Sequence, residues 1–328
     1  MKAIVYHRYG LPDVLKLEEV EKPTPRDDEV LVKVQAVSIN GSDWEGLIGK
    51  PLYARIGGLF KPSGGILGSD IAGRVETVGK DVTQFQPGDE VFGETLSYRG
   101  GFAEYVCAPE RGLAQKPAGL TFAEAAAFPQ GAVIALQGIR NKGQIQPGQK
   151  VLINGAGGSA GTFAVQLAKM YGAEVTGVDN ARKFDMLRSL GVDHLIDYTR
   201  EDFTKNGRRY DFILDVAAYH SVFGYKRALN ANGSCFMVGG SMATLLQVLL
   251  LGSRIGRAEG KYIGLLVVRP NTKDLLFMTG LYEARKIIPV IDRSFPLSEV
   301  PEAMRYLGEG HAKGKIIITM EQNDDKPR

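Results

Sequence analysis

A strand, a glycine-rich turn and a helix follow one another near residues 151–171, and this succession limits the possible folds most strongly. Val151–Ile153 are short and aliphatic, as expected of a buried parallel strand. Asn154–Gly161 contain four glycines, and Thr162–Tyr171 place apolar residues at helical spacing. Glycines in this context let a pyrophosphate reach backbone N–H groups at a helix N-terminus. The stretch predicts a dinucleotide site, with a purely structural turn as the alternative.

The turn departs from the usual dinucleotide fingerprint at one position. Gly155–Ala156–Gly157 fits its start, but Ala160 stands where the last glycine is expected. The pattern can also be read one position later, with the helix starting later. No Gly-Lys-Ser/Thr sequence ends the turn, which disfavours a P-loop. The residues expected to hold the phosphates are Gly155, Ala156, Gly157, Gly158, Ser159, Ala160 and Gly161.

From Lys150 onward, predicted strands and helices alternate, which requires a parallel, doubly wound sheet. The predicted strands are Val151–Ile153, Glu174–Val178, His194–Ile196, Phe212–Leu214 and Ser234–Val238. The predicted helices are Thr162–Tyr171, Arg182–Leu190 and Ser221–Leu229. Ligands of such sheets lie beyond the carboxyl ends of the strands. A cofactor at the glycine turn is therefore expected to face a cleft between two domains.

The first 120 residues have a different pattern, in which short strands are separated by glycine and proline turns. Its predicted strands are Ala3–His7, Leu15–Glu19, Val30–Ser38, Ile71–Val78, Glu90–Phe92 and Ala103–Cys107. Many short strands suggest a small barrel or sandwich. Thr121–Arg140 is compatible with a helix broken at Pro129.

Two late strands, Ile288–Ile291 and Ile316–Thr319, are expected to rejoin the N-terminal domain. The predicted domains are thus 1–121 completed by 290–320, and 122–289. Glu321–Arg328 is polar, and we expect it to be a disordered tail.

Composition excludes several classes of partner. Forty basic and 37 acidic residues are interspersed to a net charge of +3, which leaves no footprint for nucleic acid. Cys107 and Cys235 imply neither a disulfide framework nor a four-cysteine zinc lobe, so a reduced cytoplasm is expected. The N-terminus is typical of a strand rather than a signal peptide. The apolar run Leu245–Leu251 is too short to span a bilayer; it fits a buried helix or an apolar surface patch, and we favour burial.

Residues of both charges follow the second predicted strand of the nucleotide-binding half. Asp179 comes first, and an acidic residue there commonly binds the adenosine ribose. Arg182 and Lys183 follow, and a cationic hydrogen bond to a 2′-phosphate contributes about 1.5–3 kcal/mol. Two such bonds outweigh one carboxylate provided that Asp179 turns away. The alternative is that both basic residues form the wet first turn of a helix. The pattern favours NADP(H) and leaves NAD(H) open.

Several segments of the chain are similar, in number and in order, to those of one enzyme superfamily. They are MKAIVYHRYG, VSINGSDW, GSDIAGRVETVG, QPGDEVFG, GGFAEYV, PGQKVLINGAGGSAGTFAVQLAK, LGVDHLIDY and HAKGKIII. Over nearly its full length the chain resembles the medium-chain dehydrogenase/reductase superfamily, above all its zinc-independent quinone oxidoreductases. The resemblance implies a GroES-like β-barrel followed by a Rossmann domain, with the final strands returning to the barrel.

The resemblance also implies cofactor-binding positions. Members that use NADPH place a lysine and a tyrosine near the 2′-phosphate, and Lys183 and Tyr198 match them. Asp179 departs from the small or neutral residue usual there. Ser159 and Ala160 replace the commoner Gly and Val but are small enough for backbone approach. Outside the glycine turn, the cofactor-binding residues expected are Gln130, Val133, Asp179, Asn180, Arg182, Lys183, Tyr198, Val216, Gly239, Gly240 and Ser241.

Zinc-binding members carry a Cys in the segment matching Val37–Asp43 and Gly-His-Glu in the segment matching Gly68–Asp70. This chain has Asn40 and Gly68–Ser69–Asp70 there, which offer no thiolate or imidazole. The histidines match no such motif and are interpreted as ordinary ones: His7, His194, His220 and His311. We therefore expect no catalytic metal.

Without a metal, an electron-poor acceptor is the easier substrate, because no Lewis acid stabilises an alkoxide. The candidates for orienting it are Asn40, Ser42 and Tyr53. By resemblance Asn40 lies near the nicotinamide, although Asn40–Gly41 is also turn chemistry. Tyr53 donates to the substrate carbonyl or simply packs. Asp43 is interpreted as a helix cap before Trp44–Ile48.

The resulting hypothesis is an NADPH-dependent, zinc-independent reductase of quinones or α,β-unsaturated carbonyl compounds. A zinc-free alcohol dehydrogenase-like enzyme and a nucleotide-binding sensor with little turnover are the alternatives. A small-molecule substrate and, by resemblance, a homodimer are expected, with no stable insertion into a membrane.

Overall fold

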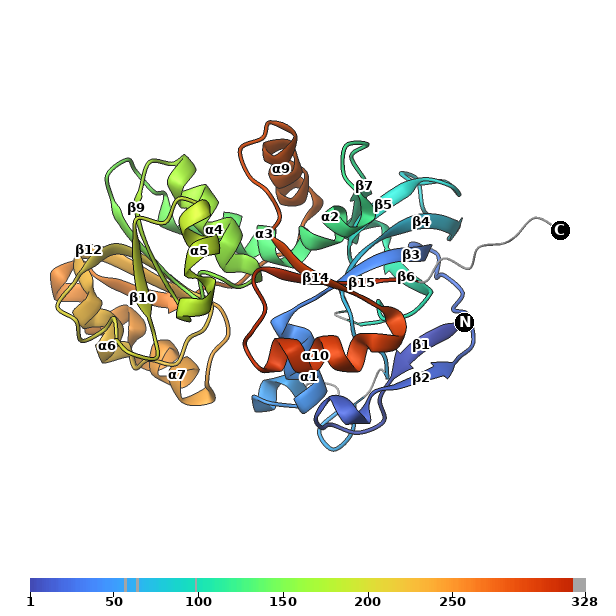
Figure 1. The fold of residues 1–328 in the computed structure, drawn as a ribbon, viewed down its shortest axis with the longest axis horizontal. Coiled ribbons are helices and arrows are strands. Elements are labelled where there is room, and N and C mark those ends of the chain that lie inside the picture. The colour runs from blue at the N-terminus through green and yellow to red at the C-terminus, as the bar shows by residue number, and fades with distance from the viewer. Residues whose placement is uncertain (56–57, 63–64, 98, 321–328) are drawn as a thin grey trace. The chain divides into compact units, whose positions relative to one another are not determined.

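The computed structural model describes residues 1–55, 58–62, 65–97 and 99–320, which form two compact units (Figure 1). The first unit contains Met1–Gln130, Pro270–Leu276 and Ile291–Arg328, and the second contains Gly131–Arg269 and Phe277–Val290. The tail Glu321–Arg328, for which disorder is expected, lies outside the described residues.

The first unit is built mainly of short strands. They are β1 (Lys2–Val5), β2 (Lys16–Glu19), β3 (Glu29–Ile39), β4 (Asp70–Val78), β5 (Glu90–Glu94), β6 (Tyr105–Pro109), β7 (Leu113–Gln115), β14 (Ile291–Pro296) and β15 (Lys315–Thr319). Its helices are α1 (Gly41–Ile48), α2 (Phe122–Ala127) and α10 (Val300–Gly308), with 3-10 turns η1 (Pro12–Val14), η2 (Leu52–Arg55), η3 (Glu110–Gly112) and η8 (Leu297–Glu299).

Strand β3 organises this unit because it is long enough to pair with three others. It runs antiparallel to β4, β6 and β15, and register shifts along it allow the bend that these pairings need. Residues 30–32 and Val34 are buried while Lys33 is exposed, so β3 is covered on both faces over its first residues. The pairing of Ile316 with Ile39 confirms that Ile316–Thr319 rejoins the N-terminal part of the chain.

The second unit alternates strands and helices. Its strands are β8 (Lys150–Asn154), β9 (Glu174–Asp179), β10 (His194–Asp197), β11 (Tyr210–Asp215), β12 (Leu229–Met237) and β13 (Tyr262–Leu265). Its helical segments are η4 (Gln137–Gly143), α4 (Ser159–Met170), η5 (Ala181–Lys183), α5 (Phe184–Ser189), α6 (Val222–Ala228), α7 (Met242–Gln247), η6 (Val248–Gly252), α8 (Ser253–Ile255) and η7 (Arg257–Glu259). Two more, α3 (Pro129–Leu136) and α9 (Thr272–Glu283), contribute residues to both units.

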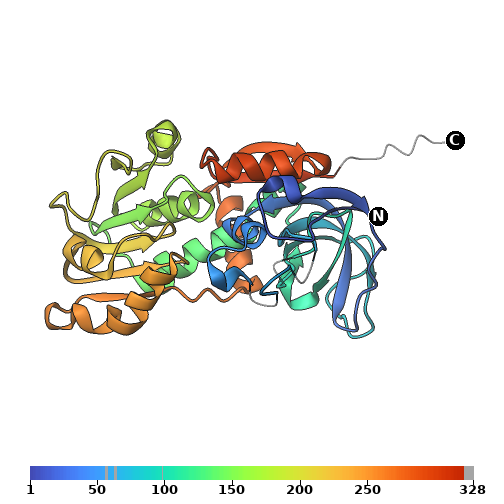
Figure 2. The ribbon, with the colours of Figure 1, turned by 90° about the horizontal axis from the view of Figure 1, so that it is seen from below.

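The sheet of the second unit confirms the doubly wound prediction. Over the described residues its order is β10-β9-β8-β11-β12-β13, with every pairing parallel. Figure 2 gives a second view of the helices beside this sheet. The strand order reverses direction between β8 and β11, and ligands of open α/β sheets bind beyond such a switch point. The glycine turn follows β8 and thus stands at that point.

Several predicted elements differ from those observed. Helix α4 begins at Ser159, three residues before the predicted Thr162. The strand predicted at Ala103–Cys107 lies at Tyr105–Pro109, because Ala103 instead forms an isolated bridge with Ala3. The strand predicted at Ile288–Ile291 is wrong: β14 begins at Ile291. The Ile288 backbone is held outside the sheet by the side chain of Gln166, which bonds both its N–H and its C=O.

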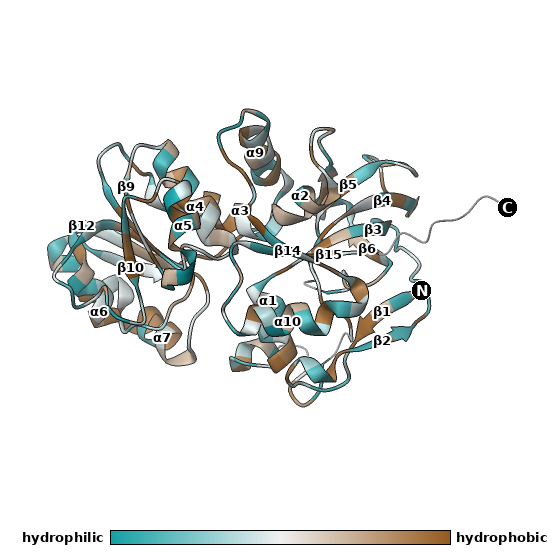
Figure 3. Cartoon of the chain, viewed as in Figure 1, coloured by the Kyte–Doolittle hydropathy of each residue, from teal (hydrophilic) through white to brown (hydrophobic). Residues whose placement is uncertain are grey.

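The expectation that Leu245–Leu251 is buried is also wrong. Leu249 and Leu250 are each 67% exposed, and Met242, Leu246 and Leu251 are exposed beside them. The ribbon beside the label α7 is largely brown, that is hydrophobic, in Figure 3. The segment packs through its other side instead, where Thr244 and Val248 are buried. No helix in the described part of the chain is long and apolar enough to cross a membrane.

Candidate cofactor and substrate site

Two glycines at the turn between β8 and α4 cannot be replaced by residues with side chains. Gly155 has φ +78°, and a Cβ added there would lie 2.8 Å from Val216 Cγ2. A Cβ on Gly161 would lie 2.1 Å from the Gly155 carbonyl oxygen, so the helix approaches the turn closely only because this residue is glycine. The N–H groups of residues 155–158 are already bonded to Val178, Asp179 and Gly155. A diphosphate would therefore meet the N–H groups that open α4, from Ser159 onward.

The opening of α4 carries an unsatisfied buried hydroxyl. Ser159 Oγ is buried and has no hydrogen-bond partner among the described residues. Ser159 is the first residue of α4, where the opening N–H groups have no intrahelical acceptor. A Cβ on Gly131 would lie 2.5 Å from this oxygen, so a glycine leaves room beside it. Orphaned polar atoms at a helix N-terminus fit an anionic nucleotide.

The carboxylate of Asp179 lies over the same turn. Its Oδ2 accepts the N–H of Gly157 at 2.7 Å, and its Oδ1 accepts the N–H of Asn180 at 2.8 Å. Lys183 Nζ lies 3.1 Å from Oδ1. The preference for NADP(H) drawn from residue charges required Asp179 to turn away, and it does not: the backbone N–H and the ammonium hold it inward.

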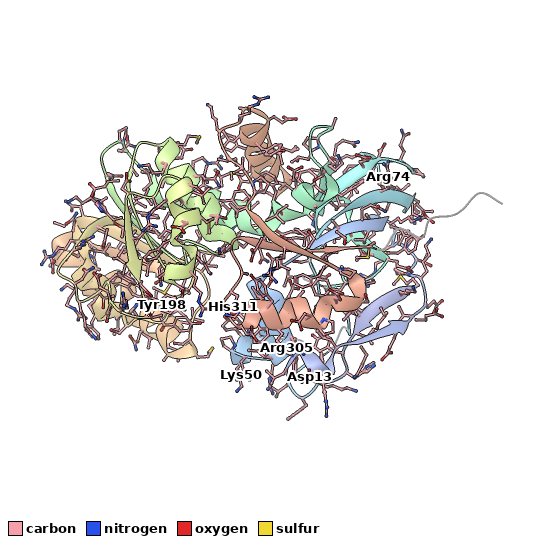
Figure 4. The ribbon with its side chains drawn as sticks, viewed as in Figure 1. Asp13, Lys50, Arg74, Tyr198, Arg305 and His311 are labelled. Atoms are coloured by element: carbon pink, nitrogen blue, oxygen red, sulfur yellow. The ribbon has the colours of Figure 1, made fainter. Side chains whose placement is uncertain are left out.

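The residues expected at the adenosine end gather on neighbouring strands. Asp179 and Asp197 are register partners on β9 and β10, so Tyr198, labelled in Figure 4, follows beside Asn180. Tyr198 is 60% exposed. The Asn180 side chain accepts the N–H of Arg182 and begins η5, while the Arg182 side chain is exposed. The structure thus collects both basic residues, Tyr198 and one carboxylate at a single edge.

The residues expected to line the nicotinamide lie mostly after the adjacent strands. Val216 follows β11 and donates its N–H to the Asn154 carbonyl at 3.1 Å. Gly239 and Gly240 follow β12 with positive φ, and Ser241 caps α7 by accepting the N–H of Thr244. Val133 is buried in α3. Gln130 belongs to the first unit.

In the first unit, Asn40 joins β3 to α1. It is the N-cap residue of α1, and its N–H donates to Asp43 Oδ2 at 2.8 Å. Asp43 is therefore not the cap itself, because the helix begins at Gly41 rather than Trp44. Its buried carboxylate sits in the first turn and also accepts the N–H of Gly68 at 2.8 Å. Burial raises the pKa of Asp43 to about 7 despite these two hydrogen bonds.

The other two orienting candidates have partners within the first unit. Ser42 Oγ donates to the side-chain oxygen of Gln130 at 3.3 Å, and the Gln130 N–H donates to Asp70 Oδ2 at 3.0 Å. Tyr53 Oη donates to Glu45 at 3.2 Å, a contact the sequence did not suggest. Tyr53 is only partly buried, so its ring is not a core residue.

A buried charged cluster beside Asn40 was missed by the sequence analysis. The ammonium of Lys315, at the start of β15, donates to Ser38 Oγ at 2.8 Å, to Asn40 Oδ1 at 2.8 Å and to Asp70 Oδ2 at 3.1 Å. Lys315 and Asp70 are both fully buried. The available signal was a lysine directly preceding three isoleucines in a strand.

A second carboxyl group adjoins this cluster. Glu94, the last residue of β5, is buried, and its Oε2 has no hydrogen-bond partner among the described residues. Burial, and after it the charge of Asp70, raise the pKa of Glu94 to about 8, while the charge of Lys315 opposes both. The cluster thus combines one ammonium with several carboxyls and retains protons near neutral pH.

Two protein families match the chain. One, described as zinc-binding dehydrogenase, matches residues 190–318, and the alcohol dehydrogenase GroES-like domain matches residues 26–118. The chloroplastic quinone-oxidoreductase QR1 of Triphysaria versicolor is 31% identical, over 97% of this chain and 98% of its own length. The chloroplastic NADPH-dependent alkenal/one oxidoreductase of Arabidopsis thaliana is 33% identical, over 97% of this chain and 79% of its own.

Among solved structures, the quinone oxidoreductase from Coxiella burnetii superposes with a TM-score of 0.87 and 30% identity, covering 97% of this chain and 99% of that one. The chain belongs to the medium-chain dehydrogenase/reductase superfamily. It falls with the quinone oxidoreductases, which confirms the resemblance drawn from its segments. A GroES-like domain and a Rossmann sheet are the fold of this superfamily, and its members are oxidoreductases.

One matching family is described as zinc-binding, but Asn40 and Ser69 do not fit a zinc site. The Asn40 side-chain N–H donates to Ser69 Oγ at 3.4 Å, so these two side chains are adjacent. They offer a neutral amide and a hydroxyl, whereas zinc prefers thiolate and imidazole. The buried ammonium of Lys315 also contacts Asn40, and a second cation there would be repelled. In the described ranges, no group of three or more His, Cys, Asp or Glu could hold a metal ion.

Proposed function

We propose that this protein is an NADPH-dependent, zinc-independent reductase that transfers hydride to quinones or α,β-unsaturated carbonyl compounds. The start of α4 carries the proposal, because glycines at positions 155 and 161 let the turn and helix approach closely, and the opening N–H groups of the helix lie beside the unsatisfied Ser159 hydroxyl. The names of the similar quinone and alkenal/one oxidoreductases support the substrate class.

Arg182, Lys183 and Tyr198 support NADPH over NADH. They occupy one edge of the sheet, where the 2′-phosphate of a nucleotide on the glycine turn would lie. Asp179 opposes this choice because its carboxylate stays inward, although Lys183 neutralises it at 3.1 Å. NADPH is therefore the preferred cofactor, and NADH remains the alternative that the kinetic comparison in the Discussion tests.

The residues of the first unit would orient the acceptor rather than activate it. When bound, the nicotinamide supplies the hydride. Charge then moves to the carbonyl oxygen of the acceptor, and a positioned N–H or O–H donor stabilises it. Asn40 is the proposed donor, and Ser42 and Tyr53 are proposed to hold the acceptor in place. A quinone or enone suits this arrangement, because neither needs a Lewis acid.

The decisive experiment measures steady-state NADPH oxidation with 1,4-benzoquinone, with 3-buten-2-one and, in the reverse sense, NADP⁺ reduction with a primary alcohol. We expect turnover of the first two acceptors and little with the alcohol. An equal rate with the alcohol would establish an alcohol dehydrogenase. Tight NADPH binding without turnover would indicate a sensor. Prior treatment with a chelator should leave the rates unchanged, and a loss restored by zinc would contradict the metal-free assignment.

We also propose a homodimer formed through β13 and the exposed apolar face of Met242, Leu246, Leu249, Leu250 and Leu251. Strand β13 is an edge strand whose only partner in the described sheet is β12. It contacts η6, which contains Leu249, Leu250 and Leu251. Two copies joined edge to edge would pair the free backbone groups and cover both leucine faces. A bare apolar face of this kind marks an interface.

Light scattering tests the dimer with Leu249→Glu/Leu250→Glu, which should produce a monomer. Leu11→Glu is the matched control, because Leu11 is as exposed but lies in the first unit. A monomeric wild type, or a dimer that survives the double substitution, would contradict the interface.

We assign the cytoplasm as the compartment from composition: neither of the two cysteines needs an oxidising environment.

A further inference from the structure

The ammonium of Lys315 has no hydrogen left to offer a ligand. Its three N–H bonds go to Ser38 Oγ, Asn40 Oδ1 and Asp70 Oδ2, and the side chain is fully buried. Asp70 itself accepts hydrogen bonds from Ser38 and Ser69. The ammonium is thus enclosed by oxygen atoms from β3, β4 and the residue that caps α1. It cannot donate directly to a substrate.

What Lys315 does fix is the orientation of the Asn40 amide. An ammonium only donates, so the amide oxygen of Asn40 must face it and the amide NH₂ must face away. One N–H of that NH₂ group reaches Ser69 Oγ at 3.4 Å. The other has no acceptor among the described residues. In the flipped orientation the amide NH₂ group would face the ammonium, and two groups that only donate would oppose each other. The lysine therefore excludes this orientation.

A purely stabilising role does not account for a charge in this position. A buried ion pair contributes little net stability, because the desolvation of both ions offsets their attraction. Apolar side chains of similar volume fill such a space equally well. Fixing one orientation of a neighbouring amide is something that an apolar side chain cannot do.

We propose that Lys315 is a positioning residue for the reduction: it holds Asn40 with its NH₂ group available as the hydrogen-bond donor to the carbonyl oxygen of the acceptor. This inference rests on the proposed reductase function. It assigns to β15, more than 270 residues from Asn40 in sequence, a part in the geometry of the site. Asp70 and Ser38 hold the lysine in place. Asn40, which is only 2% exposed without a ligand, is the group proposed to contact the substrate.

The test is a double-mutant cycle between Asn40→Ala and the charge-balanced change Lys315→Met/Asp70→Asn, which removes both members of the ion pair together. Each alone should lower kcat for 3-buten-2-one about 100-fold, as for the loss of one oxyanion donor. Combined, they should lower it no further, because both remove the same donor. The KM for NADPH should change less than about two-fold in all three variants.

Lys116→Met is the matched control. Lys116 is a buried lysine of the same unit, with an ion pair to Glu90 and hydrogen bonds to the carbonyls of Pro117 and Leu120. Its replacement should destabilise the fold yet leave kcat within about two-fold of wild type. An equal fall in kcat for this control would mean that lost stability, and not orientation of Asn40, lowers the rate.

Asn40→Asp tests the proposal if the Lys315 variant does not fold. It keeps an oxygen against the ammonium but removes the NH₂ donor, so kcat should fall as far as in Asn40→Ala. Wild-type kcat in this variant, or additive losses in the cycle, would overturn the proposal.

A readout without turnover separates this inference from the proposed function. In ¹⁵N–¹H spectra the Asn40 side-chain NH₂ signals should be distinct and slowly exchanging in wild type, and averaged or lost in Lys315→Met/Asp70→Asn. Unchanged signals would overturn the positioning role. Failure of wild type to reduce any acceptor would instead refute the reductase, whatever the spectra show.

Discussion

Two lysine–aspartate pairs have the same nitrogen–oxygen distance but differ in their access to solvent. Lys315–Asp70 in the first unit and Lys183–Asp179 in the second are both 3.1 Å apart. The first pair is completely buried, whereas the side chains of the second are 11% and 7% exposed at the edge of the glycine turn. Lys315 is saturated by three oxygen acceptors, while Asp179 occupies the backbone N–H of Gly157.

The two pairs differ in whether a ligand can take the place of the aspartate. Nothing from solvent can take the place of Asp70, because no path to water remains at a fully buried site. At Asp179 an incoming phosphate can take the same kind of bond, since the carboxylate already acts as an anion against a backbone N–H and an ammonium. The first pair therefore sets geometry permanently, and the second is a place where a ligand competes with the protein.

Stability should separate the two pairs most clearly. Lys315→Met leaves a buried carboxylate without its cation and should lower the free energy of unfolding by about 3–5 kcal/mol. Lys183→Met leaves Asp179 with two backbone N–H donors and some access to water, so it should lower the free energy of unfolding less than Lys315→Met does. Urea denaturation of both variants measures this, and equal losses would mean that the two pairs do not differ in kind.

The pH dependence of stability should reveal the carboxyls around the first pair. Burial raises the pKa of Glu94 to about 8 and that of Asp43 to about 7, both above their unfolded values. The native state then binds more protons than the unfolded state, so stability should decrease as pH rises from about 5 to about 8. Asp70 and Lys315 are the charged groups facing Glu94.

Thermal denaturation across this range checks the sign. Glu94→Gln should flatten most of the decrease and be more stable than wild type above pH 8, an effect smaller than that of Lys315→Met. Glu21→Gln, at an exposed carboxyl of the same unit, is the control. A wild-type stability that rises over this range would show that Glu94 is ionised in the fold.

Sequence reasoning succeeded where a single backbone requirement decides the structure. The turn at Gly155 and Gly161 was predictable, because close approach of helix and strand tolerates no Cβ there. The parallel sheet followed from alternating patterns alone. In the site, the cluster of Asp179, Lys183 and Tyr198 was predictable as a set of residues, since strand ends bring it together, but not the direction in which the Asp179 carboxylate points.

The failures share a different cause. Lys315 meets Asn40 only through the pairing of β15 with β3, a contact between the two ends of the chain that no local pattern encodes. The run Leu245–Leu251 is apolar at every position except Gln247, so its sequence does not show which face the rest of the fold covers. Asn40 was left open between turn and site residue, and the structure shows that it caps α1 and also contacts Lys315.

Cofactor kinetics should show that Lys183 can exchange its bond to Asp179 for a bond to the 2′-phosphate of NADPH. Lys183→Ala should raise the KM for NADPH about 10-fold more than that for NADH, because a charged hydrogen bond to phosphate is worth about 1.5–3 kcal/mol before the loss of its bond to Asp179 is subtracted. Lys169→Ala, which removes an ion pair to Asp193 in the same unit, should affect both cofactors alike. An equal effect of Lys183→Ala on both would place this lysine away from the phosphate.

Asp179→Asn should produce the smallest change, and its sign tests the competition directly. The amide still accepts the N–H of Gly157 but no longer repels a phosphate or neutralises Lys183, so the preference for NADPH over NADH should increase about 3-fold. Asp193→Asn, which leaves the glycine turn untouched, should not alter the ratio of kcat/KM for the two cofactors. A fall in NADPH preference on Asp179→Asn would mean that the carboxylate holds Lys183 ready for the phosphate, so that the second pair, like the first, is a positioning device.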